Sequence, residues 1–197
     1  MPVFQLAERL DDSYFTAGMH GSVIHGFKQF VLVKDGPAAW DSIAASAGSG
    51  GWYHATQIYP DDEFKVLVDR TAAHWQRPVS DVVAEFGESL APVLLDMYQA
   101  FVDRRWRTLD LLMASESVIH RTVRMRDPLA SPPQLQTERV RADEVHIRYA
   151  SPRRLCAIAV GLCRGLAAHF RERVSIDQPQ CMERGDPNCR LVVRQLP

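Results

Sequence analysis

Three prolines about two-thirds of the way along the chain constrain its fold more than any other feature. Pro128 is followed closely by the adjacent pair Pro132 and Pro133. Proline fixes the φ angle, lacks an amide hydrogen and disfavours helical backbone in the residue before it, so this segment excludes a helix and favours a stiff, extended connection. We therefore expect two parts with different secondary structure, residues 19–125 and residues 126–197.

The first part is predicted to be helical. Residues 47–51 and 59–62 are rich in turn-forming types and interrupt the helical pattern. Gly87 is expected to end one helix before another begins near Pro92.

The second part is predicted to contain strands and one helix. Apolar and polar residues alternate over 134–140 and 144–149, a one-sided apolar stripe begins near Pro152, and a turn at 185–188 joins two further strands. Helices followed by antiparallel strands with one covering helix give an α+β fold.

Composition excludes several classes of protein. The chain has 23 Lys and Arg against 24 Asp and Glu, so no basic excess points to nucleic acid. The longest apolar run falls far short of the roughly 20 residues of a membrane span, and the acidic N-terminus is unlike an export signal. We expect a cytoplasmic protein that binds neither nucleic acid nor membrane, and the absence of known catalytic motifs predicts no enzymatic activity.

The longest uninterrupted helical pattern, residues 104–124, carries His120 on its apolar side. Glu116 and Ser117 replace apolar residues on the same stripe, just before the histidine. A histidine in this setting is either a hydrogen-bonded core residue or a ligand to metal or haem.

A second candidate set is Tyr149, Ser151 and Arg153, which leave the end of a predicted strand with their side chains on one face. Two hydroxyls and a guanidinium on one face can hold a dianionic ligand such as a pair of carboxylates. A core tyrosine, a helix cap and a solvated arginine are the structural alternative.

Together these residues resemble the haem nitric oxide/oxygen binding (H-NOX) family, the sensor domain of soluble guanylate cyclase and of bacterial stand-alone gas sensors. Its signature is an axial histidine, then a proline, then Tyr-x-Ser-x-Arg, and here Pro133 lies 13 positions and Tyr149 lies 29 positions after His120. Residues 19–21 and 84–87 resemble further family segments. The resemblance implies a single haem-binding sensor domain over residues 19–197, preceded by an extension of residues 1–18.

The resemblance also implies roles for particular residues. His120 would ligate the iron of haem b, Pro133 would press on the porphyrin, and the Tyr-Ser-Arg set would hold the propionates. Ile158 stands where oxygen-binding members carry a tyrosine, which predicts binding of nitric oxide and carbon monoxide but not of oxygen. The implied haem-binding residues are His120, Pro133, Tyr149, Ser151, Arg153, Phe27, Ile158 and Leu162.

The family resemblance implies signalling through a partner. Gas binding opposite His120 would break the iron–histidine bond, and the signal would pass to a separate protein, a histidine kinase or a cyclic-di-GMP enzyme. A haem enzyme that consumes nitric oxide is a weaker alternative, because the expected pocket offers no acid or base.

The cysteines give a second signal. Cys181 and Cys189 flank the predicted turn, and Cys156 could approach them from the helix. Some family members bind zinc through such a set and a histidine three residues before the first hairpin cysteine, but Gln178 occupies that position here.

The fourth ligand of a zinc ion could then be water, His169 or Asp177. Cys163, seven residues after Cys156 on one helix, lies about 10 Å from it and is not expected to share the ion. The alternative function is a zinc and cysteine redox sensor in which haem is incidental or absent.

Overall fold

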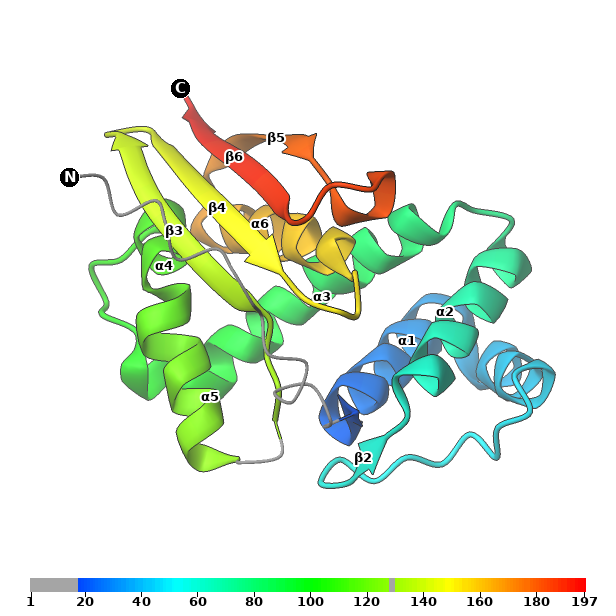
Figure 1. Cartoon of the computed structure of the whole chain (residues 1–197). Helices are drawn as coiled ribbons and strands as arrows, with labels where there is room; N and C mark the ends of the chain where they lie inside the picture. The colour runs from blue at the N-terminus through cyan, green and yellow to red at the C-terminus, as the bar shows by residue number, and fades with distance from the viewer. Residues whose placement is uncertain (1–17, 128–129) are drawn as a thin grey trace.

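The computed structural model describes residues 18–127 and 130–197. The N-terminal extension predicted for residues 1–18 lies outside the described residues except for Gly18, and so does Pro128. A helical part and a part built on a sheet are both present (Figure 1). The first contains β1 (Met19–His20), α1 (Gly21–Ser46), β2 (Ile58–Tyr59), α2 (Asp61–Trp75), α3 (Val79–Tyr98) and a 3-10 turn, η2 (Gln99–Phe101).

The chain then forms a broken helix that leads into the second part. Its segments are α4 (Thr108–Ala114), a π-helical turn labelled η3 (Ser115–His120) and α5 (Arg121–Arg126). The second part contains β3 (Gln134–Arg141), β4 (Glu144–Ala150), α6 (Cys156–Phe170), β5 (Arg173–Gln180), a 3-10 turn η4 (Met182–Arg184) and β6 (Cys189–Leu196).

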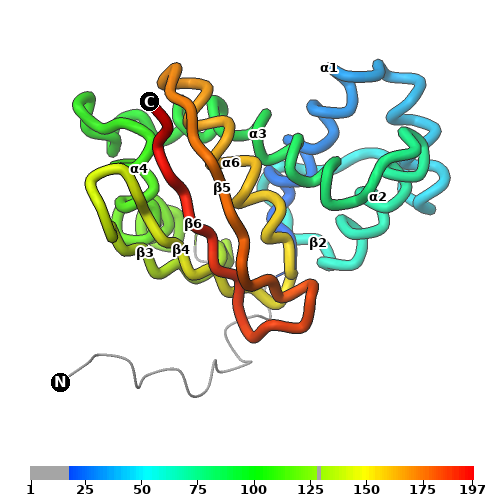
Figure 2. The backbone as a smooth tube through the Cα atoms, turned by 90° about the horizontal axis from the view of Figure 1, so that it is seen from above, coloured from blue at the N-terminus to red at the C-terminus, as the bar shows by residue number. Residues whose placement is uncertain are grey.

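The four long strands form one antiparallel sheet in the order β3-β4-β6-β5. Val145, Ile147 and Tyr149 are buried on the face that packs on α4 and α6, whereas Arg148 on the opposite face is exposed. Figure 2 shows β5 and β6 lying across α6, with α1 and α2 to one side. The α+β fold and the alternating strand pattern predicted from the sequence are confirmed.

The first part has its own core of aromatic residues. The ring of Phe27 makes edge contacts with Phe64 and Phe86 at centroid distances of 5.4 and 5.2 Å, and all three side chains are buried. Since α3 contributes Phe86 to this core and also packs on α6, it joins the two parts.

Helix α3 continues through Gly87 and Pro92, so the predicted break at Gly87 is wrong. A Cβ atom on Gly87 would lie 2.4 Å from the carbonyl oxygen of Ile158, and one on Gly161 would lie 1.9 Å from that of Ala84. These glycines allow α3 and α6 to approach closely, which is a non-local requirement that a sequence pattern does not reveal.

The predicted helix over 104–124 is also corrected. It begins only at Thr108, because the Asp110 carboxylate accepts a hydrogen bond from the backbone N–H of Arg107 at 3.1 Å and caps the helix there. It is not the longest helix: α1 has 26 residues and bends at Gly36, which has φ +80°, before Pro37.

The helix predicted in the second part of the chain begins later than expected. Helix α6 begins at Cys156, not near Pro152, because Arg154 adopts a left-handed φ of +55°. Within residues 18–127 and 130–197, no helix combines the length and apolar character needed to cross a membrane.

Candidate functional site

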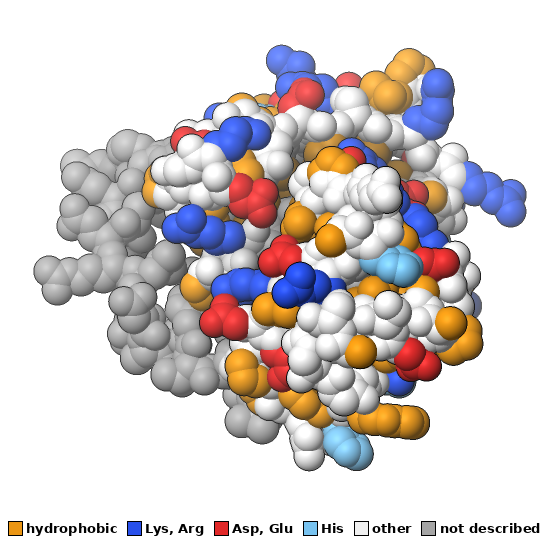
Figure 3. Space-filling model, turned by 90° about the vertical axis from the view of Figure 1, so that its right-hand side faces the viewer, with side chains coloured by type: hydrophobic (Ala, Val, Ile, Leu, Met, Phe, Trp, Pro, Cys, Tyr) orange, Lys and Arg blue, Asp and Glu red, His pale blue; other side chains and the backbone are white. Residues whose placement is uncertain are grey.

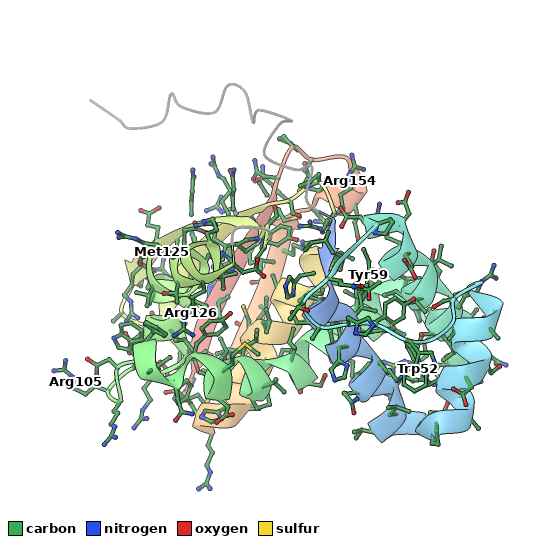
Figure 4. All side chains as sticks on the ribbon, turned by 90° about the horizontal axis from the view of Figure 1, so that it is seen from below. Trp52, Tyr59, Arg105, Met125, Arg126 and Arg154 are labelled. Atoms are coloured by element: carbon green, nitrogen blue, oxygen red, sulfur yellow. The ribbon has the colours of Figure 1, made fainter. Side chains whose placement is uncertain are left out.

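A cavity of about 1780 Å³ lies between the two parts, and most of the predicted site residues line it. Its walls come from α1, α3, α5, α6, the proline segment and the end of β4. In Figure 4, Arg126 at the end of α5 lies on one side of the molecule and Tyr59 and Trp52 lie on the other. The predicted residues that line the cavity are His120, Pro133, Tyr149, Ser151, Arg153, Ile158 and Leu162.

Phe27, by contrast, is not among the lining residues. Its side chain is fully buried in the aromatic core of the first part, behind the cavity wall. Many other wall residues were not predicted, although their three- and four-residue spacing on helices could have revealed them. They include Val23, Gly26 and Phe30 on α1 and Phe86, Leu90 and Leu94 on α3.

His120 is the last residue of the π-helical turn, and its side chain is only 17% exposed. Its Nδ1 atom lies 3.1 Å from Oε2 of Glu116. With Nδ1–H donated to a carboxylate, Nε2 is the ring nitrogen with a lone pair for a metal. The imidazole would therefore be able to ligate a metal bound in the cavity through Nε2.

Three groups, from His120, Arg124 and Leu135, hydrogen-bond to the Glu116 carboxylate. Arg124 donates to Oε1, and the backbone N–H of Leu135 donates to Oε2 at 3.1 Å. Burial alone would raise the pKa of the Glu116 carboxyl, but the hydrogen bonds from His120 and Arg124 lower this pKa to about 2. In the sequence, Glu116 stands out only as a polar residue that interrupts the apolar stripe.

Tyr149, Ser151 and Arg153, the predicted anion clamp, line the same cavity, but the guanidinium of Arg153 already donates hydrogen bonds to other groups of the protein. Arg153 donates from Nε to Asp61 at 2.8 Å, from Nη1 to the carbonyl of Ser131 at 2.7 Å and from Nη2 to that of Gly18 at 3.0 Å. Its side chain is 9% exposed, so the alternative of a solvated arginine is wrong. A bound carboxylate must share this guanidinium with Asp61.

The other two members of the clamp are buried on the same side of the cavity. Burial raises the pKa of Tyr149, which keeps the phenol protonated and able to donate a hydrogen bond. The Ser151 hydroxyl accepts a hydrogen bond from the backbone N–H of Arg153 at 3.3 Å. The His120 imidazole and a set of hydroxyl and guanidinium donors thus line one cavity, as a haem with two propionates requires.

The wall around Ile158 and Leu162 is largely apolar but includes polar groups that sequence analysis missed. Gln29 and His25 from α1 and Ser89 from α3 also line the cavity. The Ser89 hydroxyl donates to the carbonyl oxygen of Phe86 at 2.8 Å, so its proton is already engaged.

Comparison with known proteins identifies the family. The sequence model of the haem-NO-binding family matches residues 20–178. This chain belongs to the haem-NO-binding, or H-NOX, family. The H-NOX fold supports a haem-based gas sensor.

Solved structures of H-NOX proteins are similar to this chain over nearly its whole length. An H-NOX protein from S. oneidensis in the Fe(II)NO state is 27% identical, with a TM-score of 0.84 over 91% of this chain and 100% of that one. The SO2144 H-NOX domain from Shewanella oneidensis in the Fe(II)CO state is also 27% identical, with a TM-score of 0.81 over 90% and 99% of the two chains.

A third structure extends the fold comparison. The Fe(II) unliganded H-NOX protein from K. algicida is 22% identical, with a TM-score of 0.82 over 91% of this chain and 97% of that one. No curated protein sequence matches the chain.

In this H-NOX chain the three predicted cysteines do come together. The Sγ atoms of Cys156, Cys181 and Cys189 lie within 4.8 Å of one another, and those of Cys156 and Cys181 are 3.6 Å apart. All three are buried and free, and burial raises the pKa of the Cys156 and Cys189 thiols. Cys163 packs instead in the core beneath the sheet.

No fourth ligand of the expected kind joins the thiols in the described part of the chain. Asp177 pairs with Arg194, and His169 lines the large cavity. The Gln178 side chain lies next to the Cys156 thiol, and its Nε2 atom is buried.

Proposed function

We propose that this chain is a ferrous haem sensor that binds nitric oxide and carbon monoxide and discriminates against oxygen. The observation that carries the proposal is the pairing of His120 Nδ1 with Glu116 at 3.1 Å, on the wall of a cavity also lined by Tyr149, Ser151 and Arg153. Residues 19–197 form a single haem-binding domain in this proposal, and residues 1–18 form an N-terminal extension.

Each residue of the set has one task. His120 binds the iron of haem b through Nε2, while Arg153, Tyr149 and Ser151 donate hydrogen bonds to the propionates. Pro133, whose φ angle is fixed, lines the cavity and would contact the porphyrin. Ferrous haem supplies the open coordination position for a diatomic gas.

In this proposal, selectivity depends on Ile158, Leu162 and Ser89, which line the same cavity as His120. Oxygen would need a hydrogen-bond donor in the cavity to be held at ferrous haem, whereas nitric oxide would not. Ile158 and Leu162 have no donor, and Ser89 is already bonded to the backbone of Phe86. Gln29 and His25, the other polar residues named on this wall, are exposed to solvent. These residues favour nitric oxide over oxygen.

Release of His120 from the iron is the proposed signal. The histidine lies between α4, which packs on the sheet, and α5, and Asp127 just after α5 forms an ion pair with His20 before α1 at 2.7 Å. Arg153 makes a second connection, to Asp61 at the start of α2. A change in the position of His120 can therefore shift the two parts relative to each other.

In this proposal the chain catalyses no reaction itself and passes its signal to a separate protein, a histidine kinase or a cyclic-di-GMP enzyme. Four free cysteines favour a reducing compartment such as the cytoplasm. On the face seen in Figure 3, positive and negative side chains are interspersed, so a partner bound there would meet mixed charge and not a field of one sign.

The absorption spectrum of the reduced protein tests the proposal. We expect a Soret band that does not move in air and that shifts with nitric oxide to the position typical of a nitrosyl haem without histidine. His120→Gly should lose the ferrous spectrum of the wild type and recover it with imidazole. A protein that takes up no haem on reconstitution, or that binds oxygen stably, would contradict it.

The cysteine cluster supports a second function. We propose that Cys156, Cys181 and Cys189 bind zinc, with water as the fourth ligand, because three thiols within 4.8 Å match a tetrahedral zinc–sulfur site. The alternative is a thiol redox sensor in which Cys156 and Cys181 form a disulfide on oxidation.

Metal analysis separates these possibilities. We expect about one zinc per chain, lost in Cys189→Ser but retained in the matched variant Cys163→Ser, because Cys163 is buried away from the cluster. Protein purified without zinc, and with two fewer titratable thiols after oxidation, would favour the redox sensor.

A further inference from the structure

Glu116 occupies a place in the site that goes beyond the roles implied for the axial histidine and the clamp. It lies near the start of the same π-helical turn that His120 ends, four residues earlier in the chain. In this turn the backbone is wider than in an α-helix, and such turns occur often at functional sites. The turn brings the Glu116 carboxylate against the imidazole on the side away from Nε2.

Both oxygens of the Glu116 carboxylate have partners. Oε1 accepts from Arg124, and Oε2 accepts from the backbone N–H of Leu135 as well as from His120. A carboxylate that faces an arginine and two N–H donors is stabilised in its ionised form. Its position is therefore fixed before any ligand enters the cavity.

One of these partners connects the histidine to the proline segment. Leu135 follows Pro133 by two residues and lies at the beginning of β3. The neighbouring Thr137 donates from its hydroxyl to the carbonyl oxygen of Met113 on α4, at 3.1 Å. The turn that carries His120 and the strand that follows Pro133 are thus held together through Glu116 and Thr137.

We infer that Glu116 is a positioning residue for His120, which orients the imidazole and sets the strength of its bond to iron. The inference rests on the proposed function, in that His120 is taken as the iron ligand. A carboxylate that accepts the Nδ1 proton fixes the tautomer and increases the basicity of Nε2, as it does for metal-bound histidines in general. Glu116 therefore slows the release of His120 when gas binds.

Glu116→Gln is the principal test, because glutamine keeps the shape of the side chain and removes its charge. In the ferrous protein we expect the iron–histidine stretching band in the resonance Raman spectrum to move to lower frequency. Loss of histidine after nitric oxide binding should become about tenfold faster, the lower end of effects measured for such partners. Glu138→Gln, an exposed site on β3, is the matched control and should change neither value.

In a second measurement, the main comparison keeps Glu116 in place and so does not depend on how Glu116→Gln folds. In His120→Gly, the cavity can be supplied with imidazole, which has an N–H to donate, or with 1-methylimidazole, which has none. We expect a higher iron–nitrogen frequency with imidazole while Glu116 is present, and a smaller difference between the two ligands in the double variant with Glu116→Gln.

The outcomes separate the two proposals. If His120→Gly retains the wild-type ferrous spectrum without added imidazole, His120 is not the ligand and the proposed function fails. If His120 is the ligand but Glu116→Gln leaves the stretching band and the rate of histidine loss unchanged, the inference about Glu116 alone is refuted. Equal frequencies with imidazole and 1-methylimidazole would also refute it.

Discussion

The contact of α3 with α6 at Gly161 allows a quantitative prediction. A Cβ atom on Gly161 would lie 1.9 Å from the carbonyl oxygen of Ala84 and 2.8 Å from the amide nitrogen of Glu88. Both are backbone atoms of α3, which cannot rotate away as a side chain can. To restore a separation of 3.0 Å from the oxygen, the helices must move apart by about 1 Å, the difference between the two distances.

The net effect of Gly161→Ala is the difference between two terms. Overpacking in a close contact costs about 1–3 kcal/mol, and the upper end applies here because backbone must move. Alanine gains about 1 kcal/mol over glycine inside a helix. We therefore expect a loss of about 2 kcal/mol, which lowers the melting temperature of a domain of this size by about 4–8 °C.

Thermal and urea unfolding followed by circular dichroism measure the loss, with haem content determined for each variant. The matched control is Gly26→Ala in α1, where the nearest atoms to a Cβ are side-chain carbons of Leu90 and Phe86 at 3.6 and 3.8 Å. That variant should be stabilised by up to about 1 kcal/mol. Equal stability of Gly161→Ala and the wild type, or equal destabilisation of both variants, would refute the reasoning.

Three further predictions concern the cavity. Arg153→Ala should release haem to apomyoglobin faster than the wild type, whereas Arg154→Ala, at an exposed position, should not; equal rates would mean that Arg153 does not hold a propionate. Asp61→Asn should release haem more slowly, because it removes the carboxylate that competes for Arg153; faster release would mean that Asp61 is needed to orient the guanidinium. The pKa of Glu116 lies at about 2 in the folded protein, below its ordinary value of 4.5, so its contribution to stability is present above pH 4.5 and lost as the pH falls toward 2. The difference in urea unfolding midpoint between the wild type and Glu116→Gln should disappear over this pH range. A difference that does not change with pH would contradict the low pKa of Glu116.

Sequence patterns were sufficient for the features of this protein that depend on neighbouring residues. Alternation at Val145 and Ile147 predicted a half-buried strand, because side chains on a strand point alternately to its two faces. The prolines at 132 and 133 predicted an extended connection, because their rings restrict the backbone directly. The order and spacing of His120, Pro133 and the Tyr-Ser-Arg set resembled the family, and all of them line one cavity.

Only the tertiary structure decided which distant residues meet. Gly87 has the sequence character of a helix end, but the approach of α6 gives it a place inside α3. Arg153 has the character of a surface residue, but Asp61 and the carbonyl of Gly18, from the far end of the chain, surround it. Glu116 interrupts an apolar stripe in the sequence, and its partner Leu135 is known only from the fold. Local sequence patterns reflect restrictions on the backbone and the spacing of buried residues. The contacts named here depend instead on how whole helices and strands pack, which no short segment encodes by itself.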